Sequence, residues 1–89
     1  MSFQWDDRKA MVNIVKHGID FADVIGVFDD EDALWQLDEH SQEERHLILS
    51  LDLKGRVVVV VFTFRGQMIR LISARKASRH EQYQYEKRR

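Results

Sequence analysis

The run from Arg56 to Phe64 constrains the fold more than any other stretch of the chain. It is rich in β-branched and aromatic residues, and every position from Val57 to Phe62 is apolar. A strand that buries only one face alternates apolar and polar residues, and this run does not alternate. We therefore predict a central strand in a sheet whose two faces are both covered by other parts of the chain.

Three other stretches have the pattern of strands, and short turns separate them: residues 33–38, 45–51 and 68–73. In the second of these, Leu47, Leu49 and Leu51 fall on one face. Residues 54–55 and 65–67 contain glycine and are typical hairpin turns. Strands that follow one another through short turns pair antiparallel, so we predict a four-stranded antiparallel sheet.

A helix is predicted near the N-terminus. Asp6 has the residue type and position of an N-cap, and Gly18 is a natural stop. Four apolar residues between them share one stripe at helical spacing, which predicts a buried face. They are Ala10, Met11, Ile14 and Val15.

A second helix is predicted to begin at a cap on Asp20 and to reach about Phe28. Its buried side is expected to contain Phe21, Val24, Ile25 and Phe28. The acidic run at residues 29–32 ends it, because adjacent acidic residues are unfavourable at a helix C-terminus.

The last predicted helix begins at Ser78. Ser78 and Glu81 have the spacing of a capping box, in which each side chain accepts a hydrogen bond from the other residue's backbone N–H. The whole chain, residues 1–89, is therefore predicted to form a single α+β domain. It would have two N-terminal helices, a four-stranded antiparallel sheet and a C-terminal helix.

Composition excludes several classes of protein. The 89 residues include no cysteine, and no apolar run approaches the ~20 residues that span a bilayer. The N-terminus lacks a secretory signal, so we expect a cytoplasmic protein. The four histidines have no metal-ligand spacing and no glycine-rich phosphate loop is present, so neither metal nor cofactor is expected.

Charge is distributed unevenly along the chain. Residues 1–40 contain ten acidic and three basic residues, whereas residues 41–89 contain five acidic and eleven basic ones. Five of the cations lie within fifteen residues, around two sheet turns and a helix start: Arg65, Arg70, Arg75, Lys76 and Arg79. A helix N-terminus also favours anions, so this region is predicted to bind phosphate.

Such a cation cluster suits RNA cleavage. Guanidinium groups bind phosphate through paired hydrogen bonds and stabilise the charge that develops when a phosphodiester breaks. RNA carries its own nucleophile, the 2′-hydroxyl, so a protein can cleave it by alignment, proton transfer and charge neutralisation without a metal. The spacing leaves an alternative open, in which the same cations form a solvated rim paired with Glu43, Glu44 and the acidic half of the chain.

Proton transfer near neutral pH would fall to a histidine. His40 and His46 are the candidates, and we favour His40 because it lies in a predicted turn, where functional residues concentrate. His80 follows Arg79 and could contact RNA. Tyr83 and Tyr85 are two positions apart on a helix and cannot share a face. One is expected to pack on the sheet and the other to stack on a base.

An ordered set of motifs resembles the BrnT-type toxins of bacterial type II toxin–antitoxin systems. The motifs are Trp5-Asp6-x-x-Lys9, Asn13 with Lys16-His17-Gly18-Ile19-x-Phe21, Phe28-Asp29-Asp30, His40-Ser41 with Glu44-Arg45, Thr63-x-Arg65, Arg70-x-Ile72-Ser73-Ala74-Arg75-Lys76-Ala77 and Glu81-x-x-x-Tyr85-Glu86. They span nearly the whole chain, and the segment from Ile72 to Ala77 is the most specific. The chain departs from the family at His80, where another basic residue is common.

The resemblance implies a fold akin to the RelE-type ribonuclease toxins and metal-independent endoribonuclease activity that arrests translation and growth. It also implies a BrnA-like ribbon-helix-helix antitoxin as partner, through which the toxin would oligomerise. By position, the resemblance places Arg65, Arg75, Lys76 and Arg79 around the scissile phosphate, and Lys9, Lys16, His17 and His40 on the same surface. We therefore predict as catalytic residues Arg65, Arg75, Lys76, Arg79 and His40, and as RNA-binding residues Lys9, Lys16, His17, Arg70, His80 and Tyr85.

Two other functions remain compatible with the residues. A non-catalytic regulator would use the basic surface to bind nucleic acid or its antitoxin, and it would bind RNA in a salt-dependent way without cleaving it. A protein-interaction domain would have no affinity for RNA.

Overall fold

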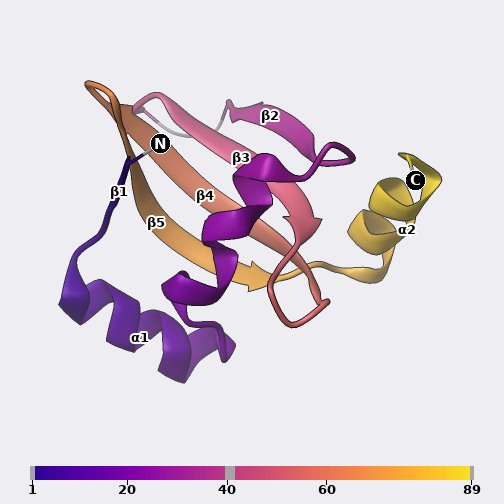
Figure 1. Cartoon of the computed structure of the whole chain (residues 1–89), viewed down its shortest axis with the longest axis horizontal. Helices are drawn as coiled ribbons and strands as arrows, with labels where there is room; N and C mark the ends of the chain where they lie inside the picture. The colour runs from indigo at the N-terminus through magenta and orange to yellow at the C-terminus, as the bar shows by residue number, and fades with distance from the viewer. Residues whose placement is uncertain (1, 40–41, 89) are drawn as a thin grey trace.

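The computed structural model describes residues 2–39 and 42–88 (Figure 1). The elements in chain order are β1 (Ser2–Gln4), α1 (Asp7–His17), η1 (Phe21–Asp29), β2 (Leu34–Asp38), β3 (Arg45–Leu51), β4 (Val57–Arg65), β5 (Met68–Lys76) and α2 (Arg79–Arg88). The predicted α+β class is confirmed. The three later strands and the C-terminal helix also form close to where the sequence predicts them.

The sheet differs from the prediction in strand number and direction. It has five strands in the order β1-β5-β4-β3-β2, and β1 runs parallel to β5 while the other pairs are antiparallel. The predicted four-stranded antiparallel sheet is therefore wrong. Strand β1 has only three residues, too few for a period to be recognised, and everything from α1 to β4 forms its crossover to β5.

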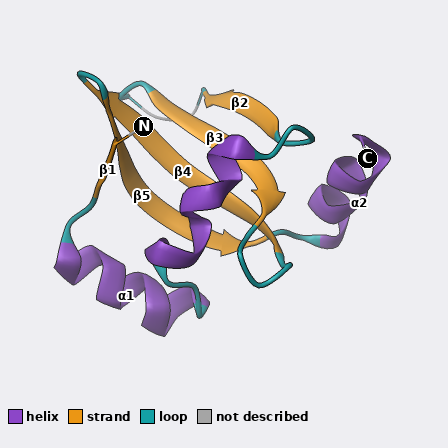
Figure 2. Cartoon of the chain, viewed as in Figure 1, coloured by secondary structure: helices purple, strands orange, loops and turns teal. Residues whose placement is uncertain are grey.

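The central strand is covered by η1 on one face and only in part by α2 on the other, so the prediction of two covered faces holds in part. In β4, Val58, Val60 and Phe62 belong to a core shared with η1, while Val59 belongs to a second core shared with Tyr85 of α2. Figure 2 shows η1 lying across one face of the sheet, and α2 beyond the C-terminal end of β5. The leucines of β3 alternate as predicted and pack in the second core.

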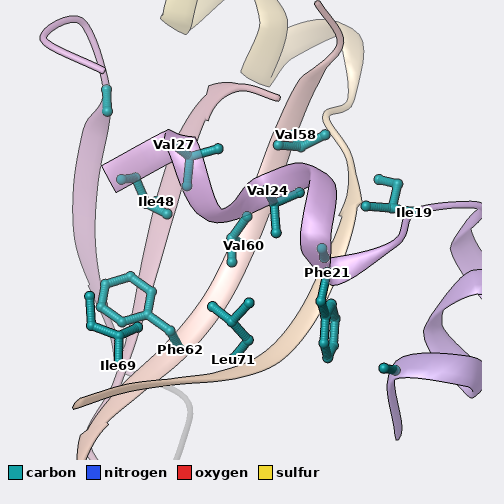
Figure 3. Close-up of a cluster of buried hydrophobic side chains, with 13 residues drawn as sticks. Ile19, Phe21, Val24, Val27, Ile48, Val58, Val60, Phe62, Ile69 and Leu71 are labelled. Carbon is teal, nitrogen blue, oxygen red and sulfur yellow. The ribbon is translucent and has the colours of Figure 1, made fainter. Parts of the chain in front are cut away.

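The second N-terminal helix is a 3₁₀ helix, η1, and not the predicted α-helix. Three residues per turn place positions three apart on one face. Phe21, Val24 and Val27 accordingly point into the core between η1 and the sheet (Figure 3). The predicted α-helical stripe assigned Ile25 to the buried face, but Ile25 is half-buried and Val27 takes its place.

Helix α1 has the predicted caps but not the predicted buried face. The Asp6 carboxylate accepts a hydrogen bond from Lys9 N (3.0 Å), and Gly18 ends the helix in the left-handed conformation (φ 71°). Met11, Ile14 and Val15 are exposed, whereas Ala10 and the polar Asn13 are buried. The predicted stripe is therefore wrong, because α1 packs along the edge of β5 and not over a sheet face.

Asn13 joins α1 to that edge. Its amide nitrogen donates to Ala74 O (2.9 Å), and its carbonyl oxygen accepts from Ala74 N (3.1 Å). The same nitrogen also donates to Ile19 O (2.9 Å). Strand β1 pairs with β5 only as far as Arg70, so beyond that point one carboxamide replaces a neighbouring strand.

Helix α2 begins with the predicted capping box. Glu81 N donates to Ser78 Oγ (3.2 Å), and Ser78 N donates to Glu81 Oε1 (2.8 Å). The Tyr85 hydroxyl donates to Asp30 Oδ2 (2.6 Å), which also accepts from Ser50 Oγ (2.6 Å). Burial opposes ionisation of Asp30, but the hydrogen bonds from Ser50, Tyr85 and the backbone together lower the pKa of its carboxyl.

We predict that Asn13→Leu lowers the free energy of unfolding by about 2–4 kcal/mol, since it leaves three buried backbone groups without their partner. Urea denaturation measures the change. Val15→Ala on the exposed side of the same helix serves as the control and should stay within about 0.5 kcal/mol of wild type. Equal stability of Asn13→Leu and wild type would contradict the assigned role.

Candidate active site and nucleic-acid interface

The face of the sheet opposite η1 carries a group of arginines, and we call it the open face. Val59 of β4 faces away from η1, so strand alternation places Thr63 and Arg65, four and six positions later, on the same face. Arg70 of β5 lies there too, because it pairs with Thr63. Arg75 lies on the same face, since it pairs with Val59 of the second core. Arg45 also lies there, because it is two positions from Leu47 in β3. Sequence reasoning missed Arg45, although its alternation with the leucines was readable.

A β-bulge is what brings Arg70 and Arg75 to the same face. They are five positions apart, an odd separation that would place them on opposite faces of a regular strand. The register shifts between Val61 and Phe62, which pair with Ser73 and Leu71, so Ile72 is the extra residue. Leu71 and Ala74 consequently both point into the η1 core, and the two arginines both point away from it.

Arg75 is held by the capping residue of α2. Its Nη1 and Nη2 donate to Glu81 Oε1 (2.8 Å) and Oε2 (3.0 Å), which makes a bidentate ion pair. Hydrogen bonding to Arg75 outweighs burial and lowers the pKa of Glu81 to about 2. The same hydrogen bonds raise the pKa of Arg75 above its ordinary value. Glu81 therefore stays ionised at neutral pH, where it orients the guanidinium and makes a poor general base.

The predicted catalytic residues do not all converge. Met68, the partner of Arg65, and Arg75 lie at opposite ends of β5, roughly 20 Å apart at the rise of a strand. Arg65 and Arg75 therefore cannot hold one phosphate, as the sequence had suggested. Lys76 and Arg79 are exposed and close to Arg75 in the chain. Lys76 lines a groove with Gln82 and Glu86 of α2. His40 lies outside the described residues.

Three predicted RNA-binding residues do come together. Lys9, Lys16 and His17 of α1 line a shallow groove of about 290 Å³ along the edge of β5, and we call it the α1 groove. Arg8 adds a further cation, and the bulge residue Ile72 and its neighbour Ser73 form the opposite wall. The groove therefore begins at the bulge that aligns Arg70 with Arg75.

The tyrosine and histidine candidates differ in burial and in the face on which they lie. Tyr85 is only 1% exposed and its hydroxyl is bonded to Asp30, so its ring cannot stack on a base and the prediction for it is wrong. Tyr83 is the exposed tyrosine of α2. His80 is exposed in the first turn of α2. His46 packs against Phe62 and Phe64 on the η1 side of the sheet, away from the arginines.

Arg70 is partly committed to the N-terminal strand. Its Nη1 donates to Gln4 Oε1 (2.6 Å), and Gln4 lies opposite it in β1. Arg45 is paired at 3.8 Å with Glu43, and its Nε is buried with no hydrogen-bond partner within the described part of the chain.

Across residues 2–39 and 42–88 no three acidic or histidine side chains gather as a metal site, and no helix is long and apolar enough to cross a membrane.

We predict that acid weakens the attachment of α2. When folding lowers the pKa of a carboxyl group, the ionised group stabilises the folded state at every pH above its pKa in the unfolded state. This stabilisation is lost as the pH falls through the pKa in the folded state. For Glu81 this window runs from about 4.5 to about 2. Glu81→Gln should remove on the order of 1–2 kcal/mol at pH 7 and little at pH 2. Parallel denaturation curves at both pH values measure it, and the Asp30 contribution cancels because both proteins contain it.

Comparison with known proteins identifies the family and the fold. Residues 5–81 match the model of the BrnT family, described as the ribonuclease toxin of a type II toxin–antitoxin system. The fold is similar to the crystal structure of the Brucella abortus ribonuclease toxin BrnT, with a TM-score of 0.74 and 30% identity over 89% of this chain and 99% of that one. No curated protein matches in sequence. The chain therefore belongs to the BrnT family of ribonuclease toxins of type II toxin–antitoxin systems.

Proposed function

We propose that this toxin is an endoribonuclease that cleaves RNA without a metal, using the arginines of its open face. The observation that carries the proposal is the bulge at Ile72, which aligns Arg70 and Arg75 on a face that α2 covers only in part. Bulges beside active sites commonly re-aim a side chain in this way. Family membership supports the ribonuclease class.

Arg75 is the residue we assign to the scissile phosphate. Glu81 accepts one N–H of each terminal nitrogen, and Lys76 O accepts a longer bond from Nη1 (3.4 Å), so Nε–H and the second N–H of Nη2 can still donate to phosphate oxygens. Because Glu81 fixes the plane of the guanidinium, Arg75 needs little reorganisation when charge develops in the transition state. Lys76 follows Arg75 directly in the chain and Arg79 follows four positions later, and both add positive charge.

The reaction itself uses RNA's own hydroxyl. The 2′-oxygen attacks the adjacent phosphorus and loses its proton, the bond to the 5′-oxygen breaks, and that oxygen takes up a proton. The products are a 2′,3′-cyclic phosphate and a 5′-hydroxyl end. His40 is our candidate for proton transfer, since Glu81 is too acidic and His46 lies on the other side of the sheet.

The remaining cations are proposed to track the RNA backbone. Arg65 lies too far from Arg75 to contact the same phosphate. We therefore assign Arg65, and Arg70 with it, to other phosphates of the RNA backbone and not to the catalytic centre. The other proposed RNA contacts are those of the α1 groove and the first turn of α2: Lys9, Lys16, His17 and His80. Such contacts give affinity that depends on salt and not on sequence.

A groove beside the Arg75–Glu81 pair can accept a base. It measures about 130 Å³ and lies between α2 and the open face. Its walls include Leu47, Leu49 and Val59, with Gln36 and Gln84 offering amide groups. An apolar slot with neutral donors and acceptors suits an unpaired base better than a phosphate, which Glu81 would repel.

The partner and the setting follow the family. We propose that a ribbon-helix-helix antitoxin resembling BrnA neutralises the toxin, that the toxin oligomerises through it, and that both act in the cytoplasm. The fold's relationship to the RelE-type toxins remains part of this proposal.

We predict that the purified protein degrades RNA in the presence of EDTA and leaves 2′,3′-cyclic phosphate ends. The 2′-hydroxyl supplies the nucleophile, so a substrate with a single deoxynucleotide at the cleaved position should resist at that bond. Mass spectrometry of the fragments identifies the ends. Activity that EDTA abolishes and added Mg²⁺ restores would contradict metal independence.

We predict that Arg75→Ala lowers kcat/KM at least about 30-fold, the equivalent of ~2 kcal/mol of transition-state stabilisation. The double variant Arg75→Ala/Glu81→Gln removes the unpaired carboxylate and should be no more active, which separates lost chemistry from lost stability. Lys54→Ala is the matched control, because Lys54 lies on the β3–β4 turn, paired with Asp23. An Arg75→Ala variant with full activity would refute the assignment.

A further inference from the structure

Helix α1 exposes an apolar face to solvent. Met11 is 69% exposed, Val12 57% and Val15 89%. At 100° per residue these three side chains fall within about 100° of one another, on the side of the helix away from Ala10 and Asn13. We call them the α1 apolar face. Val12 lines the α1 groove at one side of this face. The attachment of α1 to β5 through Asn13 involves neither Met11 nor Val15, so nothing in the described part of the chain requires these two residues to be apolar.

Cations border the α1 apolar face on one side. Arg8 lies within the same arc, and Lys9 and Lys16 follow it around the helix into the α1 groove. Exposed apolar patches with polar rims mark protein-binding surfaces. The charge of this rim selects a partner segment that carries apolar side chains flanked by acidic ones.

A second copy of the chain fits this face poorly. A two-fold contact would place the same patch of each copy against the other, and Arg8, which lies within the arc of the face, would approach its own equivalent. RNA fits poorly as well, because aliphatic side chains give neither phosphate contacts nor the aromatic stacking that bases prefer. An acidic amphipathic protein segment satisfies both the apolar face and its rim.

We propose that the antitoxin docks on the α1 apolar face through an amphipathic segment with acidic flanks. This rests on the proposed function, in which an antitoxin neutralises the toxin. A segment bound there lies against Lys9, Lys16 and His17, so it occludes the α1 groove and excludes RNA by steric overlap. Inhibition then needs no change in the Arg75 site.

The test uses the double variant Met11→Gln/Val15→Gln, with Leu53→Gln as the matched control. Leu53 is 83% exposed on the β3–β4 turn, so all three substitutions place an uncharged polar group at an exposed apolar position and leave the charge beside the α1 groove unchanged. Titration calorimetry measures affinity for the proposed ribbon-helix-helix antitoxin, and RNA binding and cleavage are measured without it. We expect the double variant to bind the antitoxin at least 50-fold more weakly, and the control to stay within two-fold of wild type. RNA affinity and cleavage should not change.

Unchanged antitoxin affinity in the double variant would overturn the proposal. So would a loss of RNA affinity, which would make this face an RNA site, or a wild-type dimer in sedimentation that the double variant dissolves. The two proposals fail separately. A wild-type protein that binds its antitoxin on α1 but never cleaves RNA would refute only the enzymatic assignment, whereas a cleaving protein with an indifferent α1 would refute only the docking site.

Discussion

The fold depends on how the outer edge of β5 is closed. Strand β1 covers its first residues only, and the Asn13 carboxamide supplies the hydrogen bonds that a longer β1 would have made to Ala74. A buried strand edge without such partners would be costly. Because a polar side chain makes this attachment, α1 lies beside the sheet with its apolar residues facing outward. The position of the α1 groove follows from the same contact.

The bulge lies in the same strand, where β5 pairs with β4, and it determines which side chains the open face displays. Without Ile72 as an extra residue, Arg75 would point towards η1 and Glu81 would have no guanidinium to bind. The Arg75–Glu81 pair in turn connects the end of β5 to the first turn of α2. One inserted residue thus orients the arginines, and one carboxylate fixes both an arginine and a helix cap.

Sequence reasoning identified the features that depend on local patterns. The β-branched run of β4, the leucine alternation of β3, the caps at Asp6 and Ser78 and the stop at Gly18 all formed as predicted. It failed where tertiary contacts decide. Three residues give β1 no period, the 3₁₀ twist of η1 changes which residues are buried, and α1 packs sideways. The sequence identified the cations as a set. Only the bulge and the length of β5 show that Arg65 and Arg75 lie on the same face but at opposite ends of the strand pair. Nothing local reveals a bulge at Ile72.

The attachment of α2 has a consequence for motion. Helix α2 is attached by the buried Tyr85 ring and its hydrogen bond to Asp30, by the pairing of Glu81 with Arg75, and by a hydrogen bond from Arg88 Nε to Asp32 O (3.3 Å). Most of its other side chains are exposed. Few buried contacts mean a small free energy of local opening, far below that of the sheet. Amide hydrogens of α2 should therefore exchange with solvent long before those of β4. Arg75, the arginine that we propose for catalysis, would then be oriented by a part of the molecule that opens readily.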